Sequence, residues 1–176
     1  KMDVHYVGHP LLDAVKNFQS EALSEADFKV EFNLDNRPII ALLPGSRKQE
    51  IKIKLPIMLE AAKKYPEYQL IVAGAPNLNE SFYKEIAAGR EMSWISNRTY
   101  DLLNNSYAGM VTSGTATLET ALFNVPQVVC YKGSAMSYQK AKLFFKVVYI
   151  SLTNLILNKK NVNESIQNAL TVSNLQ

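Results

Sequence analysis

The sequence predicts an α/β domain in which a Rossmann-like parallel sheet carries helices on both faces. Short apolar runs recur along the chain, and helix-prone segments separate them. The runs are apolar at consecutive positions, which is typical of strands that are buried on both faces. Because parallel strands place their carboxyl ends at one edge of the sheet, a ligand is expected to bind beyond that edge.

The expected elements follow from these runs in chain order. Strands are predicted at 4 to 7, 39 to 43, 69 to 73, 93 to 95, 108 to 112 and 127 to 131. Helices are predicted at 50 to 64, 79 to 88, 99 to 105, 115 to 124 and 135 to 146. The polar, acidic stretch 17 to 37 is expected to be a loop or a short exposed helix, and the stretch 158 to 176 a helix.

Composition sets the class of protein. With 176 residues, 47% of them hydrophobic, the chain can bury the core of one ordinary domain. It begins with Lys1, so we expect a piece of a longer protein. Cys130 is the single cysteine and lies in the apolar run PQVVCY, which predicts a buried thiol and no disulfide within the chain. The longest apolar stretch, 147 to 157, is too short to span a bilayer.

Positive charge is concentrated in one segment. The net charge is +3, but from Thr120 to Asn163 there are six lysines and no Asp or Glu. Such a one-sided segment indicates an anionic partner: nucleotide phosphates, nucleic acid or a membrane surface. The chain has no helix-turn-helix, zinc-finger or RNP pattern, so nucleic acid is the least favoured of the three.

The first candidate site is the stretch LLPGSRKQEI, residues 42 to 51. Pro44 ends a strand, and Gly45 permits a tight turn. Ser46 and Gln49 fit a capping box, which predicts a helix N-terminus here. Free backbone N–H groups, the helix dipole and the Arg47 guanidinium would together suit phosphate oxygens. The alternative is an ordinary capped helix with a solvated arginine.

The second candidate site is the stretch MVTSGTATLETAL, residues 110 to 122. Ser113, Gly114 and Thr115 place small groups and hydroxyls at a helix start. Glu119 lies one turn further on the same helix face. A carboxylate would repel a diphosphate but could accept hydrogen bonds from two vicinal ribose hydroxyls. The alternative is a solvated glutamate on an amphipathic helix.

The residues that bind metals are few, and one segment suits a membrane surface. The chain has two histidines, one cysteine and no cluster of acidic residues, so no metal site is expected. His9 precedes Pro10 and could be a capping residue, a polar site group or a surface histidine.

The segment 136 to 150 mixes lysines with aromatic rings and suits an anionic bilayer, or else a core-facing helix with snorkelling lysines. The residues expected at the membrane are Lys140, Lys142, Phe144, Phe145 and Lys146.

Five segments, in order, resemble the lipid-A-disaccharide synthase family: VGHPLLDAV, LLPGSRKQEI, TSGTATLETAL, PQVVCYK and YISLTNLIL. The resemblance implies an inverting GT-B glycosyltransferase with two Rossmann-like domains and no metal or other cofactor. It implies UDP-2,3-diacylglucosamine as donor, lipid X as acceptor, and lipid A disaccharide 1-phosphate and UDP as products. The expected location is the cytoplasmic face of the bacterial inner membrane, where the enzyme is peripheral.

The resemblance also assigns the domain and its residues. Residues 1 to 176 would be the C-terminal, donor-binding domain, while the N-terminal acceptor domain, with the expected acid/base carboxylate, has no counterpart here. We therefore expect UDP binding without turnover. The matching residues are Gly45, Ser46 and Arg47 at the diphosphate, Ser113, Gly114, Thr115 and Glu119 at the nucleotide, and Asn154, Glu164 and Gln167 near the sugar or phosphate. Arg47 would stabilise the leaving group.

The sequence departs from the family pattern at Thr153 and at 158 to 165. Two other classes of protein stay open. One is another UDP-sugar enzyme, such as a UDP-N-acetylglucosamine epimerase or an undecaprenyl-linked transferase. The other is a non-catalytic module that docks on anionic membranes through residues 136 to 150.

Overall fold

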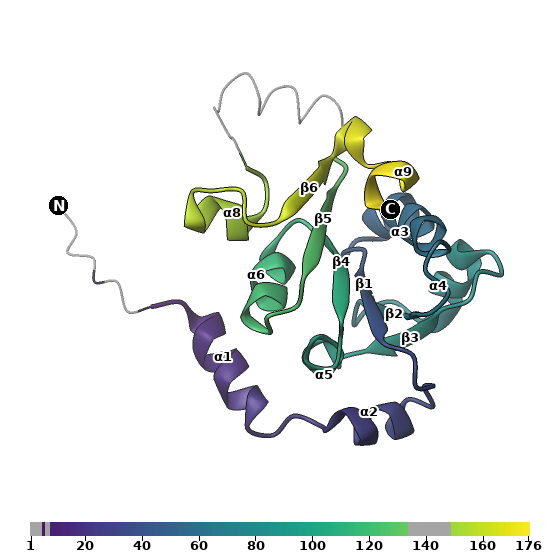
Figure 1. Ribbon diagram of the computed structural model, residues 1–176, viewed down its shortest axis with the longest axis horizontal. Helices are drawn as coiled ribbons and strands as arrows, with labels where there is room; N and C mark the ends of the chain where they lie inside the picture. The colour runs from purple at the N-terminus through teal and green to yellow at the C-terminus, as the bar shows by residue number, and fades with distance from the viewer. Residues whose placement is uncertain (1–4, 6–7, 134–148) are drawn as a thin grey trace.

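A six-stranded parallel sheet forms the centre of the computed structural model, which describes residues 5, 8–133 and 149–176 (Figure 1). The strands are β1 (Ile39–Leu43), β2 (Gln69–Gly74), β3 (Ser93–Ser96), β4 (Ala108–Thr112), β5 (Gln127–Tyr131) and β6 (Asn163–Ile166). Their order is β3-β2-β1-β4-β5-β6, the order of Rossmann folds. The chain direction across the sheet reverses between β1 and β4, which creates a crevice at their carboxyl ends.

Helices cover both faces of this sheet. They are α1 (Pro10–Gln19), α2 (Glu25–Glu31), α3 (Lys48–Ala62), α4 (Glu80–Ala87), α5 (Thr99–Asn104), α6 (Thr115–Leu122), α8 (Leu152–Leu157) and α9 (Val172–Leu175), with a 3₁₀ turn at Gln167–Ala169. In Figure 1, α3, α4 and α9 lie on one side of the strands, and α1, α6 and α8 on the other.

The strands divide the apolar core into two layers. In β1, Ile40 and Leu42 belong to the layer that α3 and α4 complete, while Ile39, Ala41 and Leu43 belong to the layer of α1, α2, α5 and α6. This alternation follows from the pleat of a strand, in which successive side chains point to opposite faces. All five residues of β1 are buried, as the unbroken apolar run predicts for a central parallel strand.

Most of the predicted elements are confirmed. The five predicted strands from 39 to 131 correspond to β1 through β5, and the four predicted helices from 50 to 124 correspond to α3 through α6, with ends shifted by at most two residues. The expected short helix within 17 to 37 is α2. The strand predicted at 4 to 7 lies, but for His5, outside the described residues, as does the helix predicted at 135 to 146.

The prediction of a helix at 158 to 176 is wrong for most of its length. Asn163–Ile166 forms β6, which pairs in parallel with β5 and extends the sheet by one edge strand. Only Val172–Leu175 is α-helical. Tertiary pairing decides this segment, because β5 offers an open edge to which the backbone of these four residues, three of them polar, can hydrogen-bond. Among the described residues, no helix has the length and apolar character needed to cross a bilayer.

Candidate functional site

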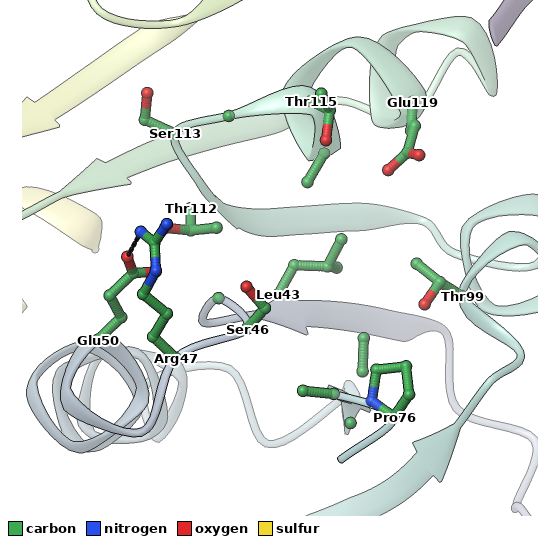
Figure 2. A pocket seen from close by; sticks show the side chains of 16 residues that line it. Leu43, Ser46, Arg47, Glu50, Pro76, Thr99, Thr112, Ser113, Thr115 and Glu119 are labelled. Carbon is green, nitrogen blue, oxygen red and sulfur yellow. Dashed lines mark hydrogen bonds and ion pairs between the residues drawn. The ribbon is translucent and has the colours of Figure 1, made fainter. Parts of the chain in front are cut away.

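A cavity of about 320 Å³ lies beyond the carboxyl ends of the neighbouring strands β1 and β4. Its walls come from the segments after β1, β2 and β4 and from the starts of α5 and α6. It brings together seven residues that the sequence predicts: Gly45, Ser46, Arg47, Ser113, Gly114, Thr115 and Glu119 (Figure 2). The two candidate stretches, 42 to 51 and 110 to 122, therefore face one crevice. Its volume is at the lower end of the range for small-molecule sites.

The turns after β1 and β4, which form two walls of the cavity, each contain a glycine with positive φ. Gly45 has φ +120° and Gly114 has φ +147°, conformations that side-chain-bearing residues rarely adopt. At Gly45 a Cβ would lie 2.4 Å from Oε2 of Glu50, so a side chain there would displace the Glu50 carboxylate. The tight turns let the chain pass directly from the buried ends of β1 and β4 into α3 and α6. Backbone amides are consequently brought to the edge of the cavity.

The helices that begin at the cavity lack side-chain caps. Arg47, Arg98 and Gly114 are the N-cap residues of α3, α5 and α6, and none makes a capping hydrogen bond through a side chain. The other described α-helices all have one, from His9, Ser24, Asn79, Ser151 and Thr171. A side-chain cap usually satisfies one of the free N–H groups of the first turn. At the cavity those groups are left to water or a ligand.

The predicted capping box at Ser46 and Gln49 is therefore wrong. The helix begins at Lys48, and Arg47 rather than Ser46 is its N-cap. Gly45, with its unusual φ, sets the entry angle so that Ser46 lines the cavity instead of capping the helix.

The capping interpretation of His9 is the one that the structure shows, because His9 Nδ1 accepts from the Leu11 N–H at 3.3 Å.

Arg47 and Glu50 form an ion pair at one end of the cavity. The distance from Arg47 Nη1 to Glu50 Oε1 is 3.0 Å, and the Arg47 side chain is 82% exposed (Figure 2). An ion pair so exposed is worth little, so the guanidinium can exchange Glu50 for another anion at small cost. Glu50 was not among the predicted site residues, although an acidic residue in the first turn of a helix, where the dipole stabilises a negative charge, is a signal that the sequence carries.

Glu119 lies at the other end of the cavity from Arg47, on α6 beside Thr115 (Figure 2). Tyr100 Oη donates to Glu119 Oε1 at 3.3 Å. Burial raises the pKa of Glu119, and the hydrogen bond from Tyr100 lowers it by a smaller amount. The Tyr100 ring packs edge-on against Phe18 and contacts Phe123, so three elements hold it in place. No local sequence signal points to Tyr100, because its partner is 19 residues away.

Asn154 and Glu164 do not line the cavity. The Asn154 amide is fully used within the protein: it donates to Val162 O and Glu164 Oε1 and accepts from the Asn161 and Val162 N–H groups. Glu164 also accepts from the backbone N–H groups of Ile150 and Ser151. These bonds tie α8 to β6.

Gln167 follows β6 with φ +52° and does not line the cavity either. Ser113 Oγ connects the cavity edge to the segment before α8, because it donates a hydrogen bond to Ile150 O at 3.0 Å. The residues predicted at the membrane, Lys140, Lys142, Phe144, Phe145 and Lys146, lie outside the described residues. In the part of the chain that is described, no group of three His, Cys, Asp or Glu could hold a metal ion.

The Cys130 prediction is confirmed. The thiol is fully buried in β5, and burial raises its pKa to about 12. A thiol with such a pKa stays protonated and unreactive at neutral pH.

Comparison with known proteins identifies the family of this chain. All of residues 1–176 match the family model for lipid-A-disaccharide synthetase. The chain belongs to this family. It is 38% identical to a lipid-A-disaccharide synthase of Syntrophus aciditrophicus, over 96% of this chain and 45% of that protein. It is 31% identical to one of Sulfurihydrogenibium sp., over 99% of this chain and 49% of that protein. The chain thus spans about half the length of these relatives.

The fold of this lipid-A-disaccharide synthetase segment is similar to that of a solved structure from another protein. A structure of S. aureus MnaA with UDP superposes with a TM-score of 0.53 at 16% identity, covering 96% of this chain and 47% of that one. The predicted fold class, a Rossmann-like parallel sheet with helices on both faces, is confirmed by this topology.

Proposed function

We propose that this domain binds the UDP part of UDP-2,3-diacylglucosamine as the donor half of an inverting glycosyltransferase. The observation that carries the proposal is the meeting of three uncapped helix starts, Arg47 and Glu119 around one cavity. Helix N-termini and an exposed guanidinium suit a diphosphate. Glu119, at the other end, suits the two ribose hydroxyls, because a carboxylate accepts two hydrogen bonds.

The complete enzyme, in this proposal, joins the donor sugar to lipid X and releases UDP. The acceptor site and the acid/base carboxylate belong to an N-terminal domain that packs against this one. The contribution of this domain to the chemistry is electrostatic: Arg47 and the amides of α3 and α6 stabilise the charge that develops on the leaving UDP. Losing one such donor typically costs about 10²–10³ in rate.

Membership of the family favours this reaction over the other UDP-sugar enzymes. Named lipid-A-disaccharide synthases are 31–38% identical to this chain, whereas the S. aureus structure is 16% identical. The substrate can be tested by competition: UDP-2,3-diacylglucosamine should displace bound UDP at lower concentration than UDP-N-acetylglucosamine does. The reverse order would favour an epimerase-like or undecaprenyl-linked enzyme.

The direct test is a calorimetric titration of the chain with UDP. Arg47→Ala and Glu119→Ala should each weaken binding tenfold or more, because one removes a charged donor to phosphate and the other the acceptor for ribose. Lys84→Ala, an exposed lysine of α4 away from the cavity, is the matched control and should bind as the wild type does. Unchanged affinity in Arg47→Ala would remove Arg47 from the site. No turnover is expected from this domain alone.

We also propose that the enzyme acts at the cytoplasmic surface of the inner membrane. At the end of α8, Leu155, Ile156 and Leu157 are 44%, 64% and 47% exposed, and Lys159 and Lys160 follow. Apolar side chains beside lysines suit the headgroup region of an anionic bilayer, where acylated substrates lie. Sedimentation with anionic vesicles should be weakened by Ile156→Ser/Leu157→Ser and by Phe144→Ser/Phe145→Ser. Equal sedimentation of these variants and the wild type would contradict membrane docking.

A further inference from the structure

Lys54 is a buried charge next to the cavity that the proposed function does not use. Its side chain is 3% exposed, and the ammonium donates a hydrogen bond to Thr112 Oγ1 and lies 3.5 Å from Glu50 Oε2. Thr112 and Glu50 both line the cavity, whereas Lys54 does not. Lysine is almost never fully buried unless it is paired. Burial lowers its pKa, while Glu50 opposes that change and favours the charged form.

Glu50 poses a problem for a site that holds phosphates. Its carboxylate is packed beside Gly45, in the turn that faces the proposed diphosphate. A negative charge there would repel the ligand, and it would also compete, though weakly, with the ligand for Arg47 through their 3.0 Å ion pair. The carboxylate therefore has to be neutralised by something other than Arg47 when a nucleotide binds.

The two cations beside Glu50 differ in their freedom to move. Arg47 is 82% exposed, so its guanidinium can swing toward a ligand without losing packing. Lys54 of α3 is buried, and its ammonium is held by Thr112 of β4, so it stays where it is. Interactions with a buried partner are also less screened by salt than interactions at the surface.

We infer that Lys54 is a positioning residue for nucleotide binding: it remains with Glu50 as a fixed counter-ion and so frees Arg47 to bind phosphate. The inference rests on the proposed function and deepens it. Without Lys54, Glu50 would both hold Arg47 more tightly and repel the incoming diphosphate. Removing the charge of Glu50 at the same time should remove the need for Lys54.

The test is a set of calorimetric titrations with UDP and with uridine, which has no phosphate. Lys54→Met keeps most of the buried stem and removes the charge, and it should weaken UDP binding about tenfold, a free-energy change of about 1.4 kcal/mol. The Glu50→Gln/Lys54→Met double variant should bind UDP within about threefold of Glu50→Gln, which shows the coupling. Uridine affinity should be the same in Lys54→Met and the wild type. Lys52→Met, an exposed lysine of the same helix, is the matched control.

The outcomes separate this inference from the proposed function. Wild-type protein that does not bind UDP would contradict the proposed function. Wild-type binding with unchanged affinity in Lys54→Met would overturn only the role of Lys54. A loss that is equal for UDP and uridine, or that persists in the Glu50→Gln background, would show a structural role and overturn the inference. If Lys54→Met does not fold, Lys54→Gln, which keeps a donor for Thr112, replaces it in the same comparison.

Discussion

Replacing Gly45 by alanine tests whether the turn after β1 is built around Glu50. The residue has φ +120°, where a side chain costs about 1–3 kcal/mol of backbone strain. The new Cβ would lie 2.4 Å from Glu50 Oε2 and 3.3 Å from Glu50 Cβ. The carboxylate ends a flexible side chain and can rotate away. That movement would disturb its ion pairs with Arg47 and Lys54.

The expected loss of folding stability in Gly45→Ala follows from comparison with Gly89→Ala. Gly89 has φ +81° and no atom within 4 Å of the point where a Cβ would lie, so alanine there meets backbone strain alone. Strain of about 1–2 kcal/mol, reduced by about 0.4–1 kcal/mol of lost unfolded-state entropy, leaves a net cost of about 0.5–1 kcal/mol. Gly45→Ala should cost about 1–2 kcal/mol more than this, because the buried Lys54 loses part of its pairing with Glu50.

Urea denaturation of both variants measures this difference, and a UDP titration measures its effect on the site. Gly45→Ala should lower both stability and UDP affinity, whereas Gly89→Ala should lower only stability. Adding Glu50→Ala to both proteins should bring the cost of Gly45→Ala close to that of Gly89→Ala, because the 2.4 Å conflict with the carboxylate is then removed and only the 3.3 Å contact with Cβ of residue 50 is left. Equal stability losses in the two single variants, with UDP affinity unchanged, would refute the reasoning.

Tyr100→Phe removes the hydroxyl that donates to Glu119 but keeps the aromatic packing, so UDP affinity should fall about three- to tenfold in a titration, with little change in thermal stability. Because burial raises the pKa of Glu119, UDP affinity should decrease on acidification at a higher pH than for an ordinary glutamate, and this part of the pH dependence should be absent from Glu119→Gln. Burial favours a higher pKa for Glu164, but hydrogen bonds from Ser151 and its neighbours outweigh it and lower the pKa. Glu164→Gln should therefore cost about 1.5–3 kcal/mol in urea denaturation at pH 7. The stabilisation from Glu164 is complete above the unfolded-state pKa of about 4.3 and is lost as the pH falls through the lower folded-state pKa.

Each of these predictions has an outcome that contradicts it. Wild-type UDP affinity in Tyr100→Phe would show that the hydroxyl does not orient Glu119. An acid limb that persists in Glu119→Gln would assign the titration to another group, such as the terminal phosphate of UDP, whose pKa is about 6. A stability difference for Glu164→Gln that is the same at pH 7 and below pH 3 would mean that the charge of Glu164 contributes nothing to it.

Most of the fold could be predicted because its signals are local. Each central strand is an unbroken apolar run, and each following helix has its own periodicity, so β1 through β5 could be located from the sequence. The edge strand β6 could not, since Asn163, Glu164 and Ser165 are polar and become a strand only by pairing with β5. Helix α1 was not predicted either, although Pro10 at its first position and His9 as its cap are start signals.

The turns of the candidate site could be predicted from the sequence, but the contacts between its distant side chains could not. Pro-Gly-Ser-Arg and Ser-Gly-Thr are contiguous in the sequence, and a parallel sheet necessarily brings strand ends together. Lys54 contacts Thr112, which is 58 residues away, and Tyr100 contacts Glu119 across two elements. Such pairs depend on how helices pack on the sheet, which the local pattern does not determine.

The distribution of helix caps indicates where this domain gives up stability for binding. A side-chain cap is typically worth about 1 kcal/mol, and five α-helices of the described chain have one. The three that start at the cavity do not, because their N-cap residues, Arg47, Arg98 and Gly114, have no side-chain acceptor for the N–H groups. A cap at these positions would fill the space and satisfy the donors that an anion needs. Under the proposed function a diphosphate supplies the missing acceptors, so the same N–H groups that leave the unliganded domain less stable provide part of the affinity for the nucleotide.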